Sequence, residues 1–444
     1  MKIVIAGAGE VGSHLARLLS RESQDIIIID SHQERIERLD STCNLLGMVG
    51  SPTSIATLRQ AINGYCDLFI AVTPEETSNV LACALAKSCG AKKTVARIDN
   101  YEFTLPANTP LFSSRGIDAM IYPELLAARE ILKSLERNWV RNWFELHDGE
   151  LIVIGVKIRD NAAIVGKSLR EISQENHYYH VSAIKRNQET IIPSGRDCVR
   201  PNDIIYFTTT REHIDGLRQL CGKTETIIRK VLIMGGSRIA VRLIALAGDK
   251  YKFRIIEIDR ERCEQLAERC PDARVTHGDA RNIDVLIDEG ISEMDAFVAL
   301  TDSSETNILT SLTAKEYGVK KTVAEVENIQ FIAQAENLNI GTIINKKLLA
   351  SGKFFQMLLD ADVESSKFMA LADADVAEIE VKPKAKVTKA PVKDLGLSRD
   401  MTIAGLIRDG HGMLVSGNTI IQPGDHVLVF CLANTIHKIE RLFN

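Results

Sequence analysis

Three glycines near the start of the chain have the spacing of a phosphate-binding loop. The segment KIVIAGAGEVGSHLARLL, which begins at Lys2, contains Gly7, Gly9 and Gly12 in the pattern Gly-x-Gly-x-x-Gly. The first glycine of this pattern permits a tight turn after a strand, the second lets the backbone approach a phosphate, and the third lets the next helix pack closely on the sheet. Because the N-terminus of that helix offers N–H groups and a positive dipole end to phosphates, the segment predicts a dinucleotide site.

Asp30 supplies the acid that such a site needs for the ribose. It ends the apolar segment DIIIID, which predicts the second strand. A carboxylate at this position accepts hydrogen bonds from ribose hydroxyls and disfavours a 2′-phosphate. We therefore expect NAD(H) rather than NADP(H) in the site.

Further polar residues follow the later strands, at the edge where parallel sheets bind ligands. Thr73 follows the predicted fourth strand and also suits a helix N-cap, because TPEE is typical of a helix start. For Arg97, on the fifth strand, a phosphate contact and a surface ion pair are equally compatible with the sequence. The predicted first site comprises Gly7, Ala8, Gly9, Glu10, Val11, Gly12, Asp30, Gly50, Ser51, Thr73, Pro74 and Arg97.

The opening pattern occurs a second time, in the segment KVLIMGGSRIAVRLIALA from Lys230. Further segments pair in the same order and at nearly the same spacing: GSPTSIATL with GDARNIDVL, TPEETSN with TDSSETN, ARIDN with AEVEN, and ELLAA with KLLAS. An internal repeat that keeps order and spacing indicates a duplicated architecture. We therefore expect two copies of one structural module.

The second copy keeps only part of the glycine pattern. Gly235 and Gly236 are retained, whereas Ser237 and Ala240 stand where the second and third glycines of the pattern stood. Asp259, in the segment IIEID, is expected to end the second strand and to replace Asp30. Two interpretations stay open, a second nucleotide site and a degenerate site that is kept only for packing.

The charge at the second site also changes. Glu325 replaces Arg97, which removes a candidate phosphate cation, and Arg238 or Arg281 could compensate. The predicted second site comprises Gly235, Gly236, Ser237, Arg238, Ile239, Asp259, Asp279 and Thr301.

Alternating strand and helix signals begin each copy. The predicted strands of the first copy are KIVIAG, DIIIID, LLGMVG, CDLFIAVT, KTVARI and DAMIYP. Because these are continuous apolar runs, they predict a doubly wound parallel α/β sheet that is covered on both faces. Short strands and turns follow in each copy and predict a small α+β domain. We expect Rossmann-like nucleotide-binding domains at residues 1–137 and 228–362, and small α+β domains at 138–222 and 370–444.

Composition and charge favour some classes of protein over others. The chain has 444 residues, 45% of them hydrophobic and 25% charged, and a net charge of −5, so it lacks the basic bias of a nucleic-acid-binding protein. Nine cysteines without a CxxC pair, and no signal peptide before the first strand, predict a cytosolic protein with reduced thiols. No apolar run reaches the roughly 18 residues of a spanning helix. The basic segment KPKAKVTKAPVK (382–393) predicts an exposed loop, with contact to anionic lipid headgroups as the alternative.

Catalytic residues are not evident in the sequence. A dehydrogenase needs an acid–base group near the nicotinamide, but the small domains offer little, and we interpret His177 and His180, in the polar segment ENHYYH, as solvated. The motifs HExxH, GxSxG and GxxxxGK[ST] are absent. We predict binding without catalysis, and an NAD-dependent oxidoreductase with an unrecognised substrate site is the alternative.

The whole chain resembles the TrkA family, the peripheral cytoplasmic subunits of bacterial Trk potassium-uptake systems. KIVIAGAGEVGSHLA, Asp30, VGSPTS, AVTPEETSN, ARIDN and YPELLAAREI match the first nucleotide-binding part, and GKSLREI and VSAIKRNQETIIPSGRDCVRPND match its C-terminal part. KVLIMGGSRIAVRLIA, IIEID, HGDARN, LTDSSETNIL and TIIQPGDHVLVF match the second module. The match extends over essentially all of the chain.

This resemblance implies two tandem RCK (or KTN) modules, each with a Rossmann-like part and a C-terminal part. It also implies a ring, typically a homotetramer, that docks on the inner face of the cell membrane against a TrkH-type potassium-translocating subunit. Members of the family bind NAD(H), and some bind ATP or ADP. The implied function is therefore a nucleotide-sensing regulatory subunit and not an enzyme, with a sensor for another transporter as a further alternative.

Overall fold

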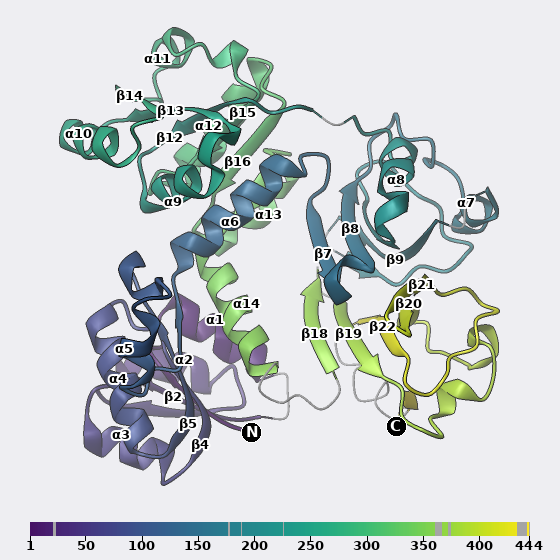
Figure 1. Cartoon of the computed structure of the whole chain (residues 1–444), viewed down its shortest axis with the longest axis horizontal. Coiled ribbons are helices and arrows are strands. Elements are labelled where there is room, and N and C mark those ends of the chain that lie inside the picture. The colour runs from purple at the N-terminus through teal and green to yellow at the C-terminus, as the bar shows by residue number, and fades with distance from the viewer. Residues whose placement is uncertain are drawn as a thin grey trace. The chain divides into compact units, whose positions relative to one another are not determined.

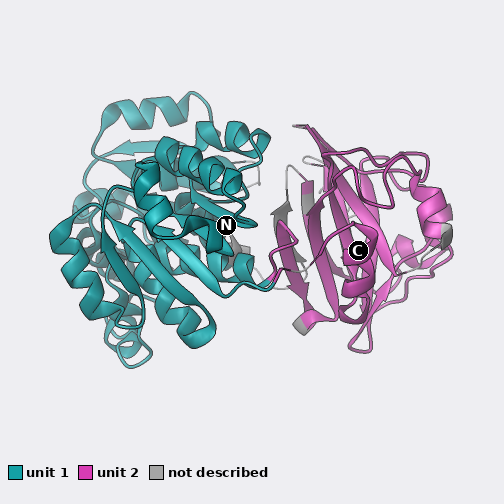
Figure 2. Cartoon of the chain, turned by 90° about the horizontal axis from the view of Figure 1, so that it is seen from above, with its two compact units in different colours: residues 1–136, 227–358 teal, residues 137–226, 359–444 magenta. Residues whose placement is uncertain are grey.

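The computed structural model consists of two compact units. It describes residues 1–20, 24–175, 178–187, 189–224, 226–359, 366–371, 374–432 and 442–443. Unit 1 comprises Met1–Glu136 and Ile227–Leu358, and unit 2 comprises Arg137–Thr226 and Leu359–Asn444 (Figure 2). Unit 1 contains two parallel sheets and unit 2 contains two antiparallel sheets. Each unit thus joins corresponding parts of the two sequence repeats.

The first parallel sheet of unit 1 has the strand order β3-β2-β1-β4-β5-β6. Its strands are β1 (Lys2–Ala6), β2 (Asp25–Asp30), β3 (Leu46–Val49), β4 (Cys66–Ala71), β5 (Ala91–Arg97) and β6 (Ala119–Ile121). Its helices are α1 (Glu10–Leu19), α2 (Gln33–Asp40), α3 (Ile55–Ile62), α4 (Glu76–Ser88), α5 (Thr109–Ser113) and α6 (Pro123–Glu136). The strand order reverses between β1 and β4, and doubly wound sheets bind ligands at such a reversal.

The second parallel sheet repeats this order as β14-β13-β12-β15-β16-β17. Its strands are β12 (Lys230–Met234), β13 (Lys252–Glu257), β14 (Arg274–His277), β15 (Ala296–Ala299), β16 (Lys321–Glu325) and β17 (Thr342–Ile344). Its helices are α9 (Arg238–Ala247), α10 (Arg260–Arg269), α11 (Ile283–Asp288), α12 (Ser304–Glu316), α13 (Ile332–Asn337) and α14 (Lys346–Leu359).

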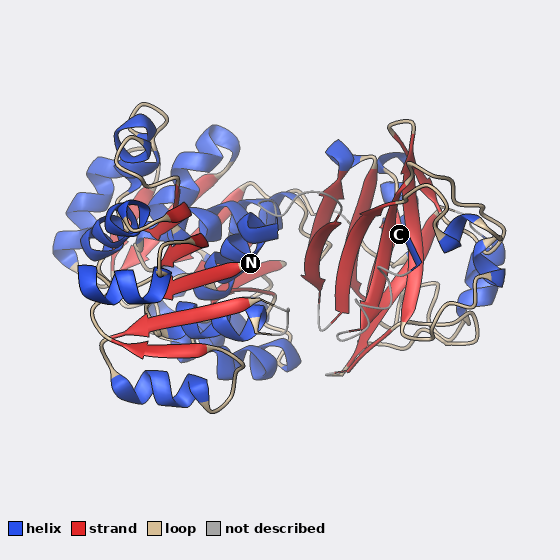
Figure 3. Cartoon of the chain, turned by 90° about the horizontal axis from the view of Figure 1, so that it is seen from below, coloured by secondary structure: helices blue, strands red, loops and turns tan. Residues whose placement is uncertain are grey.

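Both faces of each parallel sheet are covered by helices (Figure 3). In β1, Ile3 and Ile5 belong to one apolar core while Val4 and Ala6 belong to the core on the opposite face, and all four are fully buried. Side chains of a strand point alternately to the two faces, so a strand with both faces covered must be apolar throughout. The prediction of a doubly wound sheet in each repeat is confirmed.

The two halves of unit 1 exchange their last helices. Helix α6 follows the first sheet, but it packs on α9 and on the core of the second sheet (Figure 1). Helix α14 follows the second sheet, and its Ala350 and Phe354 are buried in the core that contains Ile3 and Ile5 of β1. The exchanged apolar residues of α6 are Ala127, Ala128, Ile131 and Leu135. Each Rossmann-like core of unit 1 is thus completed by a helix from the other half.

The two antiparallel sheets of unit 2 share one topology. Their strand orders are β10-β9-β11-β8-β7 and β18-β19-β22-β20-β21. The strands are β7 (Asn142–Leu146), β8 (Leu151–Lys157), β9 (Tyr179–Arg186), β10 (Glu189–Ile191), β11 (Ile204–Thr209), β18 (Ser366–Leu371), β19 (Ala374–Glu380), β20 (Met401–Arg408), β21 (His411–Leu414) and β22 (His426–Leu432), and the helices are α7 (Leu169–Glu175) and α8 (Ile214–Leu220). An apolar core with members from both sheets joins them, for example Leu146 and Tyr206 with Val376 and Leu428.

The basic segment 382–393 forms part of unit 2. It contains a short 3₁₀ helix, Lys386–Thr388, and Ala385 and Val387 are fully buried in the core of the second antiparallel sheet. The segment is therefore an anchored loop rather than a fully exposed one. Among the described helices, none combines the length and the apolar character that a crossing of the bilayer requires.

Candidate nucleotide-binding sites

The glycine loop of the first repeat lies between β1 and α1. Gly7 has a φ of +110°, a conformation that side chains disfavour, and a Cβ at Gly12 would lie 1.8 Å from the carbonyl oxygen of Gly7. Both positions therefore require glycine. Gly9 is the N-cap residue of α1 and provides no side-chain cap, and a Cβ built on it would lie in open space. The helix N-terminus is thus accessible for the N–H contacts that a phosphate makes.

Asp30 is held against this loop at the end of β2. Its Oδ2 accepts a hydrogen bond from the backbone N–H of Ala8 at 2.7 Å, and its Oδ1 accepts one from the N–H of His32 at 2.8 Å. Arg35 lies 3.5 Å from Oδ2. Burial alone would raise the pKa of Asp30, but the hydrogen bonds from His32 and Ala8 and the charge of Arg35 outweigh it, and the pKa lies below its usual value. The carboxylate is therefore ionised and fixed beside the glycine loop.

We call the edge of the first sheet beside the Gly7 loop the first crevice. Asn79 holds together the ends of β4 and β5 on the side of this crevice opposite Asp30. Its Oδ1 accepts hydrogen bonds from the N–H and the hydroxyl of Thr73, and its amide nitrogen donates to the carbonyl oxygens of Thr73 and Arg97. The prediction of Thr73 as a helix N-cap is wrong, because α4 begins at Glu76 after Glu75, and the hydroxyl of Thr73 is engaged by Asn79. Asn79 was not among the predicted site residues, although it ends the segment TPEETSN and its counterpart Asn307 ends the repeated segment TDSSETN.

Arg97 forms the ion pair that was one of the two alternatives. Its guanidinium lies 2.8 Å from Asp99 and also donates hydrogen bonds to the carbonyl oxygens of Thr73 and Pro74. The remaining predicted residues take different places. Gly50 donates its N–H to the carbonyl of Asp30, and Ser51 is exposed beside Thr53. Glu10 is paired with Lys347 of α14, and the Val11 carbonyl accepts a hydrogen bond from Ser351.

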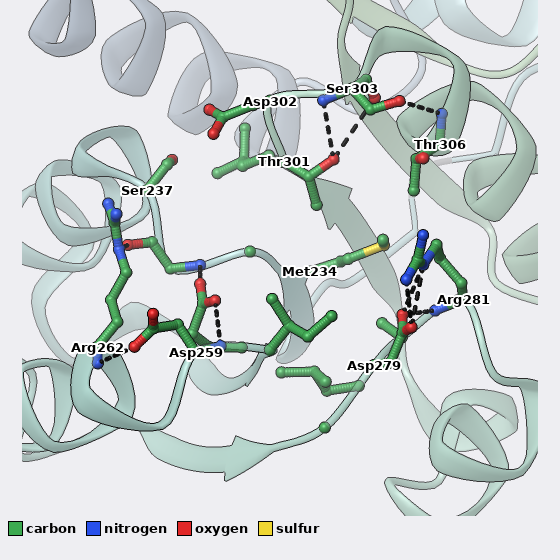
Figure 4. Close-up of a pocket in the computed structure, with 18 residues that line it drawn as sticks. Met234, Ser237, Asp259, Arg262, Asp279, Arg281, Thr301, Asp302, Ser303 and Thr306 are labelled. Atoms are coloured by element: carbon green, nitrogen blue, oxygen red, sulfur yellow. Dashed lines mark hydrogen bonds and ion pairs between the residues drawn. The ribbon is translucent and has the colours of Figure 1, made fainter.

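The second repeat has a cleft of about 460 Å³ at the corresponding place, which we call the second crevice (Figure 4). It brings together Gly235, Gly236, Ser237, Asp259, Asp279 and Thr301 of the predicted site. Arg238 and Ile239 do not line it, because Arg238 pairs with Glu124 of α6 at 3.0 Å and Ile239 is buried in a core. Figure 4 also shows Asp302, which follows the predicted Thr301, and Arg262, which was not predicted, at the border of the cleft.

Glu257, not Asp259, takes the place of Asp30 in the second repeat. Strand β13 ends at Glu257, so the prediction that Asp259 ends this strand is wrong. Glu257 accepts a hydrogen bond from the N–H of Gly236 at 2.6 Å, as Asp30 does from Ala8. Asp259 instead caps α10, where its side chain accepts from the N–H of Arg262. The two repeats differ by one residue in this interval, and the motif spacing concealed the shift.

Ser237 changes the start of the helix that faces the cleft. Its hydroxyl oxygen accepts a hydrogen bond from the N–H of Ala240 at 3.4 Å and caps α9. One of the N–H groups that a phosphate could use is thus already satisfied.

Asp279 is engaged with Arg281 through both carboxylate oxygens. Arg281, which could compensate for the loss of Arg97, is therefore partly neutralised by Asp279.

Glu325 is buried where the first repeat has Arg97. It lies 3.4 Å from Lys346, and burial raises its pKa to about 7 although the charge of Lys346 opposes this shift. Asn307 repeats the role of Asn79, because it contacts Thr301 and donates to the carbonyl oxygen of Glu325. The framework of the two crevices is thus the same, whereas a buried carboxyl group replaces the arginine at this position.

The structure describes one of the two histidines that we interpreted as solvated. His177 lies outside the described residues. The interpretation of His180 as a solvated residue is wrong, because its Nε2 lies 3.1 Å from the hydroxyl of Thr402 and burial lowers its pKa to about 4. His180 is a packed residue of unit 2.

Comparisons with known proteins match these domains to one family. The TrkA-N domain matches residues 3–123 and 231–346, and the TrkA-C domain matches residues 153–222 and 376–444. A "Trk system potassium uptake protein TrkA homolog" of Archaeoglobus fulgidus is 30% identical to the chain over 446 residues, with both chains covered completely. The "Trk system potassium uptake protein TrkA" of Halomonas elongata is 28% identical and is covered to 98%, with all of this chain covered.

Solved structures share the fold at low sequence identity. The crystal structure of the GsuK RCK domain has a TM-score of 0.60 at 15% identity, with 100% of this chain and 94% of that chain covered. The GsuK channel bound to NAD has a TM-score of 0.60 at 15% identity, with 100% and 78% covered. The names of the relatives describe potassium uptake, which confirms the resemblance drawn from the sequence and agrees with the prediction that the chain is not an enzyme.

Proposed function

The chain belongs to the TrkA family of Trk-system potassium uptake proteins, and from this premise we propose that it is a nucleotide-sensing regulatory subunit that gates a membrane potassium transporter. The observation that carries the proposal is the structure of unit 1. Two crevices of the nucleotide-binding type lie in one compact unit, and the exchanged helices α6 and α14 join them.

NAD(H) is the proposed ligand of the first crevice. The accessible start of α1 suits the pyrophosphate, and the carboxylate of Asp30 suits the ribose hydroxyls. A channel of related fold has been solved with NAD and with ADP, so ATP or ADP is the alternative ligand, including for the second crevice. The cap at Ser237 and the buried Glu325 favour a different ligand or weaker binding there.

Gating follows from the way the two crevices are joined. A ligand that prefers one angle between the two halves of unit 1 shifts α6 and α14 together, because each helix is buried in the other half. Ligands that prefer different angles bias the unit in opposite directions. A coupling free energy of about 1–3 kcal/mol, typical of allosteric proteins, changes the transporter's open probability several-fold.

The proposed assembly is a homotetrameric ring on the inner face of the cell membrane. The proposed partner is a TrkH-type potassium-translocating subunit. Within the chain, we assign the nucleotide-binding role to residues 1–137 and 228–362 and the C-terminal role to residues 138–222 and 370–444. The first site contains Gly7 to Gly12 and Asp30, and the second contains Gly235 to Ser237, Glu257 and Thr301.

Calorimetry on the full chain tests the ligand. NADH, NAD, ATP and ADP are titrated into the wild type, Asp30→Ala, and Asp160→Ala, which changes an exposed aspartate of unit 2. Loss of the charged hydrogen bonds of Asp30 is worth about 1.5–3 kcal/mol, so we expect roughly 10- to 100-fold weaker binding in Asp30→Ala and no change in the control. Equal affinity in all three proteins would remove the first crevice from the mechanism.

Flux measurements test the regulation separately. The chain is added to vesicles that contain the purified potassium-translocating subunit, and rubidium flux is followed with and without the ligand identified by calorimetry. We expect flux to change several-fold with wild type and to stay constant with Asp30→Ala. Binding without any change in flux would leave a nucleotide-binding protein and contradict the gating role.

A further inference from the structure

Three side chains with metal-binding groups meet in unit 2, far from both crevices in the sequence. They are His147, in the 3₁₀ turn after β7, Glu378 of β19 and His426 of β22, and we name them the His–Glu–His cluster. The Nε2 of His147 lies 2.5 Å from Oε1 of Glu378, and the Nδ1 of His426 lies 3.3 Å from the same oxygen. One nitrogen or oxygen atom of each residue lies within 4.8 Å of the others.

Backbone pairing places Glu378 and His426 on one face of the second antiparallel sheet. Glu380 pairs with His426 and Glu378 with Leu428, so Glu378 and His426 are diagonal neighbours. Leu428 and Val376 share this face and belong to the apolar core between the two sheets of unit 2. The side chain of Glu378 is only 7% exposed. A carboxylate in such a setting must be balanced by a cation or by strong donors.

The sheet itself does not require Glu378 or His426. In the first antiparallel sheet, Ile204 pairs with Lys157 and Tyr206 with Gly155, as His426 pairs with Glu380 and Leu428 with Glu378. Gly155 and Ile204 therefore stand at the places of Glu378 and His426, and neither can bind a metal. The same sheet forms with and without metal-binding side chains at these two places, so Glu378 and His426 are not part of the architecture that the two repeats share.

We propose that the His–Glu–His cluster binds one divalent transition-metal ion, and that Zn²⁺ fits its donor set best. Two imidazole nitrogens and one carboxylate oxygen form a three-residue zinc site with a fourth position for water. Imidazole donors favour Zn²⁺ and its neighbours over Ca²⁺ and Mg²⁺, which prefer oxygen. Zinc bonds of about 2.0–2.2 Å need only small side-chain movements from the observed separations. The ion links the turn after β7 to β19 and β22, and so connects the two sheets of unit 2.

Metal titration of the full chain tests this site. After treatment with a chelator, Co²⁺ is added and its visible absorption is followed, and Zn²⁺ binding is measured by calorimetry. The variants are His147→Ala, His426→Ala and Glu378→Gln, and the control is His411→Ala, an exposed histidine of the same unit. We expect one ion per chain for wild type and control, and at least about 100-fold weaker binding in the three variants, because even outer-shell partners contribute about 10- to 100-fold.

Thermal unfolding separates metal binding from a purely hydrogen-bonded contact. Zn²⁺ is expected to raise the midpoint of wild type and control but not of the cluster variants, because only a ligand of the folded state stabilises it. Glu378→Gln keeps the size of the side chain and serves if an alanine variant fails to fold. No ion bound to the wild type, or an affinity in Glu378→Gln and His426→Ala equal to that of the wild type, would overturn the proposal.

A second inference rests on the ion pair that each exchanged helix of unit 1 forms with the first helix of the other half. Glu10, the first residue of α1, pairs with Lys347, the second residue of α14. At the corresponding place in the other half, Arg238, the first residue of α9, pairs with Glu124, the second residue of α6. The two interfaces correspond residue by residue, but their charges are inverted.

We infer that this inversion makes each half pair with the other half and not with a copy of itself. If two first halves from different chains exchanged helices, Glu10 would meet Glu124, and if two second halves did so, Arg238 would meet Lys347. Like charges in contact are destabilising, and interfaces use such repulsion to reject wrong partners. The charges therefore favour pairing of each half with the other half of unit 1.

Charge exchange within the full chain tests this inference. The variant Glu124→Lys with Arg238→Glu keeps both ion pairs, but it makes pairing between two first halves or two second halves attractive. We expect it to form larger oligomers when refolded at high concentration, measured by light scattering. The matched control adds Glu10→Lys and Lys347→Glu, which restores the repulsion and should restore the wild-type size. Equal sizes for all three proteins at every concentration would contradict the inference.

Discussion

The first crevice of unit 1 has Gly9, Asp30 and Arg97 where the second has Ser237, Glu257 and Glu325. The residues that hold the strand ends together are unchanged, because Asn79 and Asn307 make the same four hydrogen bonds. The groups that meet a ligand have therefore diverged while the framework behind them has stayed. A duplicated site can thus acquire a second specificity without rebuilding its fold.

Removal of either asparagine should have the largest effect and should be similar in the two halves. Asn79 and Asn307 are fully buried, and Asn79→Ala or Asn307→Ala leaves several backbone groups without partners. Each such group costs about 1–3 kcal/mol, so we expect a loss of about 4 kcal/mol in the free energy of unfolding. Urea unfolding followed by circular dichroism measures it. A large loss in only one of the two variants would show that the framework is not shared.

Glu325 should make the free energy of unfolding depend on pH near neutrality, an effect that the first crevice, with Arg97 at this place, does not have. Its pKa of about 7 in the folded chain lies above the value of 4.5 that it has without burial. The stabilisation from its protonated form is complete below pH 4.5 and is lost as the pH rises through 7, by about 3 kcal/mol. We expect Glu325→Gln to remove this part of the pH dependence between pH 5 and 8, as measured by urea unfolding. Identical pH profiles for wild type and Glu325→Gln would refute the assignment.

Substitution of the N-cap residue of α1 or α9 by the residue of the other repeat should have the smallest effect on stability. Gly9→Ser adds a cap in open space, so we expect stability within about 0.5 kcal/mol of wild type but roughly tenfold weaker nucleotide binding at the first crevice. Ser237→Gly frees the start of α9 at a loss of only a few tenths of a kcal/mol. Calorimetry of both variants measures whether the helix start decides ligand affinity. Unchanged affinity in Gly9→Ser would exclude α1 from phosphate binding.

The parallel sheets could be predicted from the sequence because each strand is a continuous apolar run and the repeat shows it twice. The acid of the second crevice could not, because one residue fewer separates β12 from the end of β13, and only backbone pairing shows that Glu257 replaces Asp30. The apolar face of α6 predicts that the helix packs, but not on which sheet. His147 and Glu378 are too far apart in the sequence for any motif to join them.

The exchange of α6 and α14 has a consequence for the synthesis of the protein. Strands β1 to β6 leave the ribosome long before Lys346, where α14 begins, and domains generally fold from the N-terminal end during synthesis. Until then, the core around Ile3 and Ile5 lacks the helix that supplies Ala350 and Phe354. A nascent chain that stops before α14 therefore exposes apolar surface, which makes truncated products targets for chaperones and proteases.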